Sequence, residues 1–270
     1  FKSGFHYFSH DLDNQWHSIR NKFHNTASDS IYEPEIFGDT SAYADVYRVK
    51  PKEIAFYFQD KMEFDDMVIN IGARYDQFDP ESIIPSDRRN PANQLILPDS
   101  MTSDYPQAPV IEQISPRVGF AYQLGNQAVL HFSYGHFFQM PPMYAMYQNH
   151  SFLVDPNDFV TRMGNTLLEP EKTITYELGL WQELSRQASL DVALFYRDIY
   201  NLLTTKTLST YNQVKYGLYS NKDYGSARGL EVKLDIGFGP IKSMVNYTLQ
   251  YTSCLLYTSP SPRDATLSRM

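Results

Sequence analysis

The chain of 270 residues carries 23 basic and 31 acidic side chains, and its single cysteine excludes an internal disulfide framework and a cysteine-based metal cluster. A formal net charge of -8 without a block of Lys or Arg argues against nucleic acid as a partner, because phosphate binding needs clustered cations. With a mean hydropathy of -0.43 and no apolar run of about 18 residues, the chain has no transmembrane helix. A transmembrane β-barrel is still allowed, because tilted strands of about 9 to 11 residues need only one apolar face.

Aromatic residues are unusually frequent, with 21 Tyr and 17 Phe against 2 Trp and 13 Gly. Tyr and Phe fit the pleated surface of extended strands, so this composition favours a β fold. The chain begins at Phe1 without a charged and then apolar leader, and we therefore expect any secretion signal to lie upstream.

Apolar and polar residues alternate with a period of two, which predicts strands with one apolar and one polar face. The segment 229–237 is the clearest case, with apolar Leu230 and Val232 between charged Glu231 and Lys233. In 54–64 the alternation does not show which face points outward. Expected strands occupy 1–8, 54–64, 67–78, 115–123, 128–138, 173–183, 188–199, 229–237 and 241–251.

The connections between these segments alternate in length. Short links are expected at 65–66, 124–127, 184–187 and 238–240, and long links at 9–49, 79–114, 139–172 and 200–227. Outer-membrane barrels show this asymmetry, with tight periplasmic turns and long extracellular loops. Single-chain bacterial barrels use even strand numbers, so nine strands indicate an incomplete set.

We therefore predict an all-β fold, an incomplete antiparallel transmembrane β-barrel that occupies residues 1–252. The final segment 253–270 loses the alternation and becomes rich in Ser and Pro. It is similar to the translated sequencing-adapter tail that ends many metagenomic reading frames. We expect it to be non-native and to pack poorly.

Several stretches carry a family resemblance. They are IAFYFQDKMEFDDMVINIGARYDQFDP (54–80), ISPRVGFAYQL (114–124) with LHFSYGHFFQMPP (130–142), NTLLEPEKTITYELGL (165–180), LFYRDIYNLL (194–203) and NKDYGSARGLEVKLD (221–235). Together they resemble the TonB-dependent receptor barrel, and more closely its Oar-like subgroup with an N-terminal carboxypeptidase-regulatory-like domain. The most specific spacing is that of Asn165, Leu168, Pro170, Glu171, Tyr176, Glu177 and Gly179.

The resemblance implies a barrel of about 22 strands filled by an N-terminal plug. It also implies a bacterial outer-membrane location, active uptake of an unidentified nutrient ligand, and coupling to the TonB complex through the plug. Neither the plug nor the TonB-contacting box is part of this sequence, so coupling is expected from the resemblance alone.

The two faces of the strands lead to a candidate site. We expect the apolar face to meet lipid through Ile174, Tyr176, Leu190, Val192, Leu230, Val232 and Leu234. We expect the polar face to meet the lumen through Arg74, Asp76, Glu177, Asp191, Arg197, Glu231 and Lys233. This polar set is either a network that grips a plug or guides a solute, or a solvated wall of mixed charge.

The chain contains no GxSxG, HExxH, P-loop or GxGxxG motif, so we expect neither an enzyme nor a bound cofactor or metal. Two alternatives to an active importer stay open. One is a passive porin or structural outer-membrane protein, and the other is a secreted β-sandwich binding module.

Overall fold

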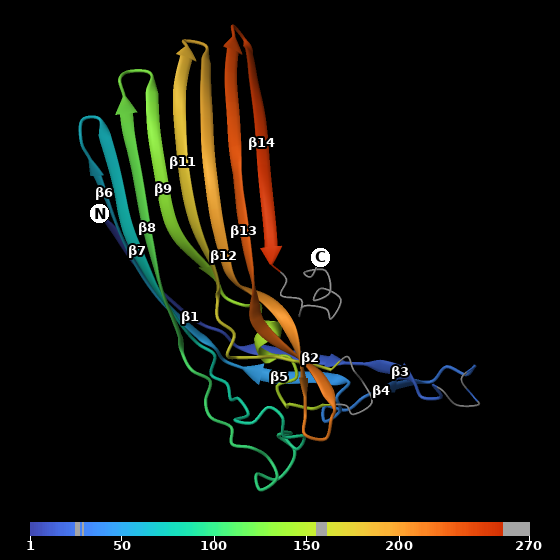
Figure 1. The fold of residues 1–270 in the computed structure, drawn as a ribbon. Helices are drawn as coiled ribbons and strands as arrows, with labels where there is room; N and C mark the ends of the chain where they lie inside the picture. The colour runs from blue at the N-terminus through green and yellow to red at the C-terminus, as the bar shows by residue number, and fades with distance from the viewer. Residues whose placement is uncertain (25–27, 29, 155–160, 256–270) are drawn as a thin grey trace, which may run out of the picture.

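One curved sheet dominates the molecule, as the computed structural model shows for residues 1–24, 28, 30–154 and 161–255 (Figure 1). Its antiparallel strands, in spatial order, are β1 (Lys2–Ser9), β6 (Lys52–Glu63), β7 (Met67–Asp79), β8 (Ile111–Leu124), β9 (Ala128–Gln139), β11 (Glu171–Ser185), β12 (Ala188–Ser209), β13 (Lys215–Phe238) and β14 (Ile241–Leu255). The short β10 (Arg162–Met163) pairs in parallel with β13. Within the described ranges, none of the helical structure is long and apolar enough to cross a bilayer.

Tight turns join the strands in pairs at one end of the sheet. They lie between β6 and β7, β8 and β9, β11 and β12, and β13 and β14, which confirms the short links expected from the sequence (Figure 1). Gly125 and Gly239 occupy two of these turns with φ of 63° and 58°. Glycine suits these positions because a side chain strains the left-handed backbone.

The long links lie at the opposite end, and two of them contain more structure than expected. Link 9–49 forms β2 (Leu12–His17), β3 (Ile19–Asn21), β4 (Pro34–Ile36) and β5 (Ala44–Val49), with β2 paired to β5 and β3 to β4. Figure 1 shows this hairpin lying across the end of the sheet, with β3 and β4 furthest out.

The prediction of a long loop at 200–227 was wrong. β12 continues to Ser209 and β13 begins at Lys215, so only a short turn separates them. The prediction ended both strands where the apolar alternation ends. Backbone pairing does not need an apolar face, however, and the ladder continues to the pair Ser209 and Lys215 after irregular register near Leu202.

The remaining long links are largely irregular. Link 139–172 contains the short helix α1 (Met143–Tyr147) and β10. At the C-terminal end β14 continues to Leu255, past the boundary expected at 252. Residues 256–270 lie outside the described part of the chain, so the origin of the tail stays a prediction.

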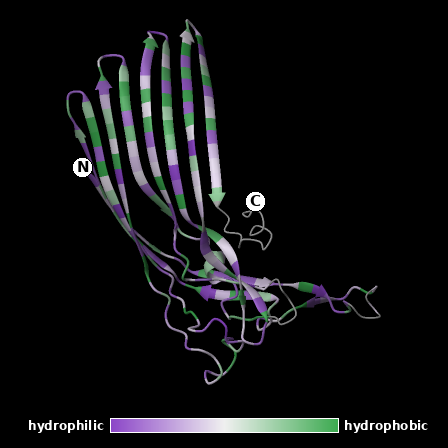
Figure 2. Cartoon of the chain, viewed as in Figure 1, coloured by the Kyte–Doolittle hydropathy of each residue, from purple (hydrophilic) through white to green (hydrophobic). Residues whose placement is uncertain are grey.

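The register places apolar side chains of neighbouring strands opposite one another. One such row crosses five strands through Phe132, Leu178, Leu194, Leu230 and Leu249. Leu194 is 54% exposed and Leu249 is 58% exposed. Figure 2 shows the matching alternation of hydrophobic and hydrophilic residues along the strands. The sheet therefore presents a broad apolar face that nothing in the described chain covers.

Strand β6, whose orientation the sequence left open, follows the same rule. Phe56 pairs with Tyr75 and Phe58 with Ala73, which places both phenylalanines on the apolar face. Asp60 shares this face near the tight-turn end, where the N-terminal ammonium lies 3.7 Å from its carboxylate.

The buried hydrophobic clusters lie at the end of the sheet that carries the long links, and their members come from these links and from β5, β7, β10 and β13. The larger one consists of Val49, Phe78, Ala145, Met146, Tyr147, Leu168 and Tyr219, and the smaller one of Phe152, Met163, Tyr216 and Leu218. Burial of apolar surface stabilises a protein by about 25 cal/mol for each Å², and a face left in water loses this stabilisation. A β-sandwich hides such a face against a second sheet, so the sandwich alternative was wrong for this chain. The uncovered face suits a lipid environment.

A charge placed on the apolar face should destabilise the barrel. Leu194→Arg should lower its unfolding free energy in lipid vesicles by about 2 to 4 kcal/mol, the cost of Arg at mid-depth in hydrocarbon. Ala193→Arg is the matched control, since Ala193 lies on the opposite face beside Glu231. Urea unfolding followed by heat-modifiable migration measures both variants. Equal destabilisation by the two substitutions would contradict the assignment of the faces.

Candidate functional site

The seven polar residues expected to face a lumen all lie on the face opposite the apolar row. The register aligns this polar face in a second row, through Gln59, Gly72, Arg117, Gly135, Thr175, Arg197 and Ala227. Arg74 and Asp76 share it through the alternation of β7, and Glu177 through that of β11. Asp191 pairs directly with Lys233, and Ala193 with Glu231. That this face lines a barrel lumen stays a prediction.

A hollow of about 980 Å³ lies against the polar face. Six strands from β6 to β12 line it, with Tyr57, Arg74, Arg117, Glu177 and Arg197 among the lining residues. Because a hollow that spans six strands of one sheet needs the sheet to curve around it, the polar face is the concave one.

The charges in the hollow are satisfied in different ways. Arg74 Nε and Nη2 both lie 2.8 Å from Asp76 Oδ1, and the Asp76 side chain is only 13% exposed. Arg117 lies over the Phe137 ring at 4.6 Å and Arg197 over the Phe195 ring at 4.8 Å. Such contacts stabilise a cation without neutralising it. Neither of these two arginines forms an ion pair within the described ranges.

Glu177 contributes a weaker contact to the same hollow. His131 Nε2 lies 3.9 Å from Glu177 Oε1, so the two form an ion pair only when the imidazole is protonated. The structure thus brings Arg74, Glu177 and Arg197 together around one space and uses Asp76 to hold Arg74.

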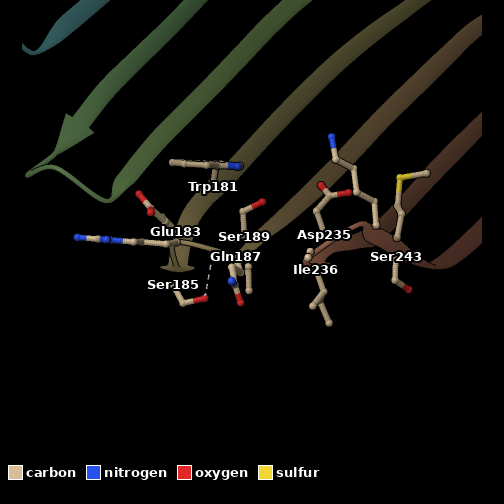
Figure 3. Close-up of a pocket in the computed structure, with 14 residues that line it drawn as sticks. Trp181, Glu183, Ser185, Gln187, Ser189, Asp235, Ile236 and Ser243 are labelled. Carbon is tan, nitrogen blue, oxygen red and sulfur yellow. Dashed lines mark hydrogen bonds between the residues drawn. The ribbon is translucent and has the colours of Figure 1, made fainter.

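The other three candidates, Asp191, Glu231 and Lys233, lie nearer the tight turns. Lys233 Nζ pairs with Asp235 Oδ2 at 3.1 Å, and Asp191 Oδ1 is buried with no hydrogen-bond partner in the described ranges. A second pocket, of about 740 Å³, lies at this rim between β11 and β14. Figure 3 shows Ser189 and Asp235 pointing to one side of the strands there and Ile236 to the other. These three candidates line neither the hollow nor the rim pocket.

Tyrosines mark the boundary of the apolar face on the side of the long links. The Tyr176 ring lies 5.1 Å from Tyr134 and 6.4 Å from Tyr196, across three neighbouring strands. The Tyr200 and Tyr224 rings lie 5.3 Å apart further along. Aromatic girdles of this kind occur where barrel walls leave the hydrocarbon.

The long links form a packed layer, here called the loop platform, that contains the two buried clusters. Tyr147 of α1 is fully buried, and its hydroxyl donates a hydrogen bond to the Pro80 carbonyl at 2.9 Å. Burial raises the pKa of Tyr147, so the phenol stays neutral. In the part of the chain that the structure describes, no group of three or more His, Cys, Asp and Glu side chains is placed to hold a metal ion.

Asn165 connects separate segments of the loop platform through its side-chain hydrogen bonds. It is 8% exposed, and its Nδ2 donates to the Tyr219 carbonyl at 2.9 Å. Its Oδ1 accepts from Arg88 Nη2 at 2.8 Å and from the Leu167 amide at 3.1 Å. Sequence reasoning found Asn165 in the most specific motif but assigned it no role, and it missed Arg88. No local signal could have identified the contact with Arg88, because 77 residues separate the two.

The chain matches the family described as "TonB dependent receptor-like, beta-barrel" over residues 2–268. The chain belongs to the TonB-dependent receptor β-barrel family. Its members are receptors and transporters of the bacterial outer membrane, not enzymes, so this receptor barrel is an outer-membrane protein. The match confirms the resemblance at the level of the family.

Several solved structures resemble the receptor barrel. The outer membrane transporter YddB of Escherichia coli is 12% identical with a TM-score of 0.57, over 93% of this chain and 30% of YddB. The FrpB iron transporter of Neisseria meningitidis is 13% identical with a TM-score of 0.53, over 81% of this chain and 28% of FrpB. The hemophore receptor HasR of Serratia marcescens is 14% identical with a TM-score of 0.52, over 92% of this chain and 42% of HasR.

Sequence identities of 12% to 14% show that the fold is shared and nothing more. The receptor barrel spans between 28% and 42% of the length of these three structures. No curated protein matches the chain.

Removing the amide of Asn165 should loosen the loop platform and leave the sheet intact. Asn165→Ala leaves a buried carbonyl, an amide and a guanidinium group without partners, at about 1 to 3 kcal/mol for each group. Hydrogen exchange in α1 and the neighbouring links should accelerate, with protection of β11 and β12 unchanged. Gln107→Ala is the control, since this exposed loop amide makes no side-chain hydrogen bond among the described residues. Unchanged exchange in Asn165→Ala would show that the platform does not depend on it.

Proposed function

We propose that this chain is the barrel portion of a TonB-dependent transporter that takes up a nutrient across the outer membrane, with its concave polar face lining the lumen. The observation that carries the proposal is the pairing of an uncovered apolar convex face with a charged hollow on the other side of the same sheet. Lipid on one side and a hydrated interior on the other account for both faces at once.

The charges of the concave face suit a protein or solute surface inside the barrel. Arg117 and Arg197 lie on aromatic rings and have no carboxylate partner among the described residues, so they are available to a bound group. An N-terminal plug outside this chain is the proposed occupant, and coupling to TonB would pass through it. The Oar-like subgroup and its regulatory-like domain are the finer form of this proposal, supported by the stretches 54–80 and 165–180.

The ligands of two similar solved structures guide the choice of substrate class. FrpB is described as an iron transporter, and HasR as a hemophore receptor in complex with its hemophore and heme. Iron chelates and heme are therefore the first ligands to test for this receptor. Glycans and peptides follow, because the loop platform presents polar and aromatic groups alike.

Cysteine accessibility tests the lumen assignment. In a full-length receptor whose native cysteines are replaced by serine, we expect Asp191→Cys and Glu231→Cys to react with a water-soluble, membrane-impermeant maleimide once the plug is deleted. Val192→Cys and Leu230→Cys are the matched controls, since each is the chain neighbour of a lumen residue but faces hydrocarbon. Heat-modifiable migration verifies that each variant is folded. Labelling of the two controls in place of the two lumen positions would reverse the assignment.

Uptake measurements test active transport. A strain that lacks the full-length gene should lose accumulation of one labelled iron chelate, heme, glycan or peptide, and the gene on a plasmid should restore it. Collapse of the proton gradient with a protonophore should abolish the restored uptake, because the energy comes from the inner membrane. Uptake that persists without the gradient, together with an upstream coding region too short for a plug, would establish the passive porin instead.

A further inference from the structure

Arg88 of the loop platform is a half-buried cation with one buried guanidinium nitrogen, Nη1. Its Nη2 donates to Asn165 Oδ1, but its Nη1 is buried and has no hydrogen-bond partner among the residues that the structure describes. No carboxylate pairs with it within the described ranges. The neighbouring Asp87 is turned away, and its Oδ1 accepts a hydrogen bond from the Arg89 amide at 2.9 Å.

Two further unpartnered groups line the same cavity as Arg88. Ser82 is 4% exposed and Thr166 is 3% exposed, and within the described part of the chain the hydroxyl of each has no hydrogen-bond partner. The cavity is small, and the centre of a water molecule can occupy about 10 Å³ of it. That is about the room that a single water molecule needs.

The three groups share one chemistry, which is that all of them can donate a hydrogen bond. A guanidinium group has no acceptor and stays protonated, so the particle in the cavity must accept at Nη1. Leaving the buried end of a guanidinium cation uncompensated is costly, which favours a negative particle over a neutral one. His150 also lines the cavity, and burial lowers the pKa of its imidazole, so it stays neutral near pH 7 and adds no second cation.

We propose that this cavity binds one small monovalent anion of the chloride class, held by Arg88 Nη1 and the hydroxyls of Ser82 and Thr166. The anion links two segments that are distant in sequence, because Ser82 and Arg88 belong to link 79–114 and Thr166 to link 139–172. The Arg88 carbonyl also accepts from the Tyr216 hydroxyl at 2.7 Å, which connects the site to β13. Occupancy therefore stiffens the platform at the end of the barrel that carries the long links.

Bromide identifies the anion directly. Crystals of the full-length receptor grown in sodium bromide should show one anomalous peak between Arg88, Ser82 and Thr166. Arg88→Gln should remove the peak, whereas Arg89→Gln should keep it, since Arg89 is exposed and contacts the Ser209 carbonyl and the Tyr211 ring. Density without an anomalous signal would identify a water molecule and overturn the proposal. A carboxylate from another part of the receptor at Nη1 would overturn it too.

Thermal melting gives a second, solution measurement on the same receptor. At constant ionic strength, replacing gluconate by chloride should raise the melting temperature saturably in the wild type and in Arg89→Gln, and should have no effect in Arg88→Gln. Ser82→Ala and Thr166→Val should each raise the half-saturating chloride concentration by about tenfold, as expected for loss of a hydrogen bond to a charged group. Chloride dependence that survives in Arg88→Gln would refute the site. Neither measurement depends on transport, so its outcome is separate from that of the proposed function.

Discussion

Backbone hydrogen bonding inside hydrocarbon is the constraint on which the rest of this structure depends. Lipid offers no partner to an amide or a carbonyl, so each strand must satisfy both groups through its neighbours. The uninterrupted pairing of β7 with β8 and of β11 with β9 meets this demand within one curved sheet. Once the backbone is paired in this way, the side chains can only alternate between the two faces. The separation of apolar and charged residues follows from that geometry.

The same constraint explains where the buried core lies. The apolar face of the sheet is exposed in the described chain, so its leucines and phenylalanines do not build a protein interior. Packing takes place at the end of the sheet that carries the long links, where Tyr147, Leu168 and Tyr219 are buried. There Asn165 supplies the hydrogen bonds that irregular segments do not form for themselves. The motif with the most specific spacing therefore stabilises the point where a long link enters β11.

The concave face is organised by aromatic rings as well as by charge. Arg197 lies on Phe195 of the same strand, and Arg74 is held by Asp76 two residues along β7. Arg117 of β8 lies on Phe137 of the adjacent strand β9. These contacts lie within one strand or between adjacent strands, so they orient each guanidinium group without using the opposite wall of a barrel. The free charge that remains in the hollow is the physical basis for the proposed plug or solute contact.

The sequence by itself determined the strands of the sheet, the tight turns and the common face of the seven polar residues. All of these follow from a period of two and from turn residues, which are local properties of the chain. It did not reveal that β12 and β13 pair as far as Ser209 and Lys215, because backbone pairing continues where the apolar pattern ends.

Only the tertiary structure decided which residues meet. It selected Arg74, Glu177 and Arg197 from the seven candidates for one hollow, because the curvature of the sheet sets the distances between strands. It also joined Arg88 to Asn165 across 77 residues, and it placed Ser82 and Thr166 at the cavity that Arg88 lines. The irregular links have no period from which such contacts could be inferred, so their partners are set by packing alone.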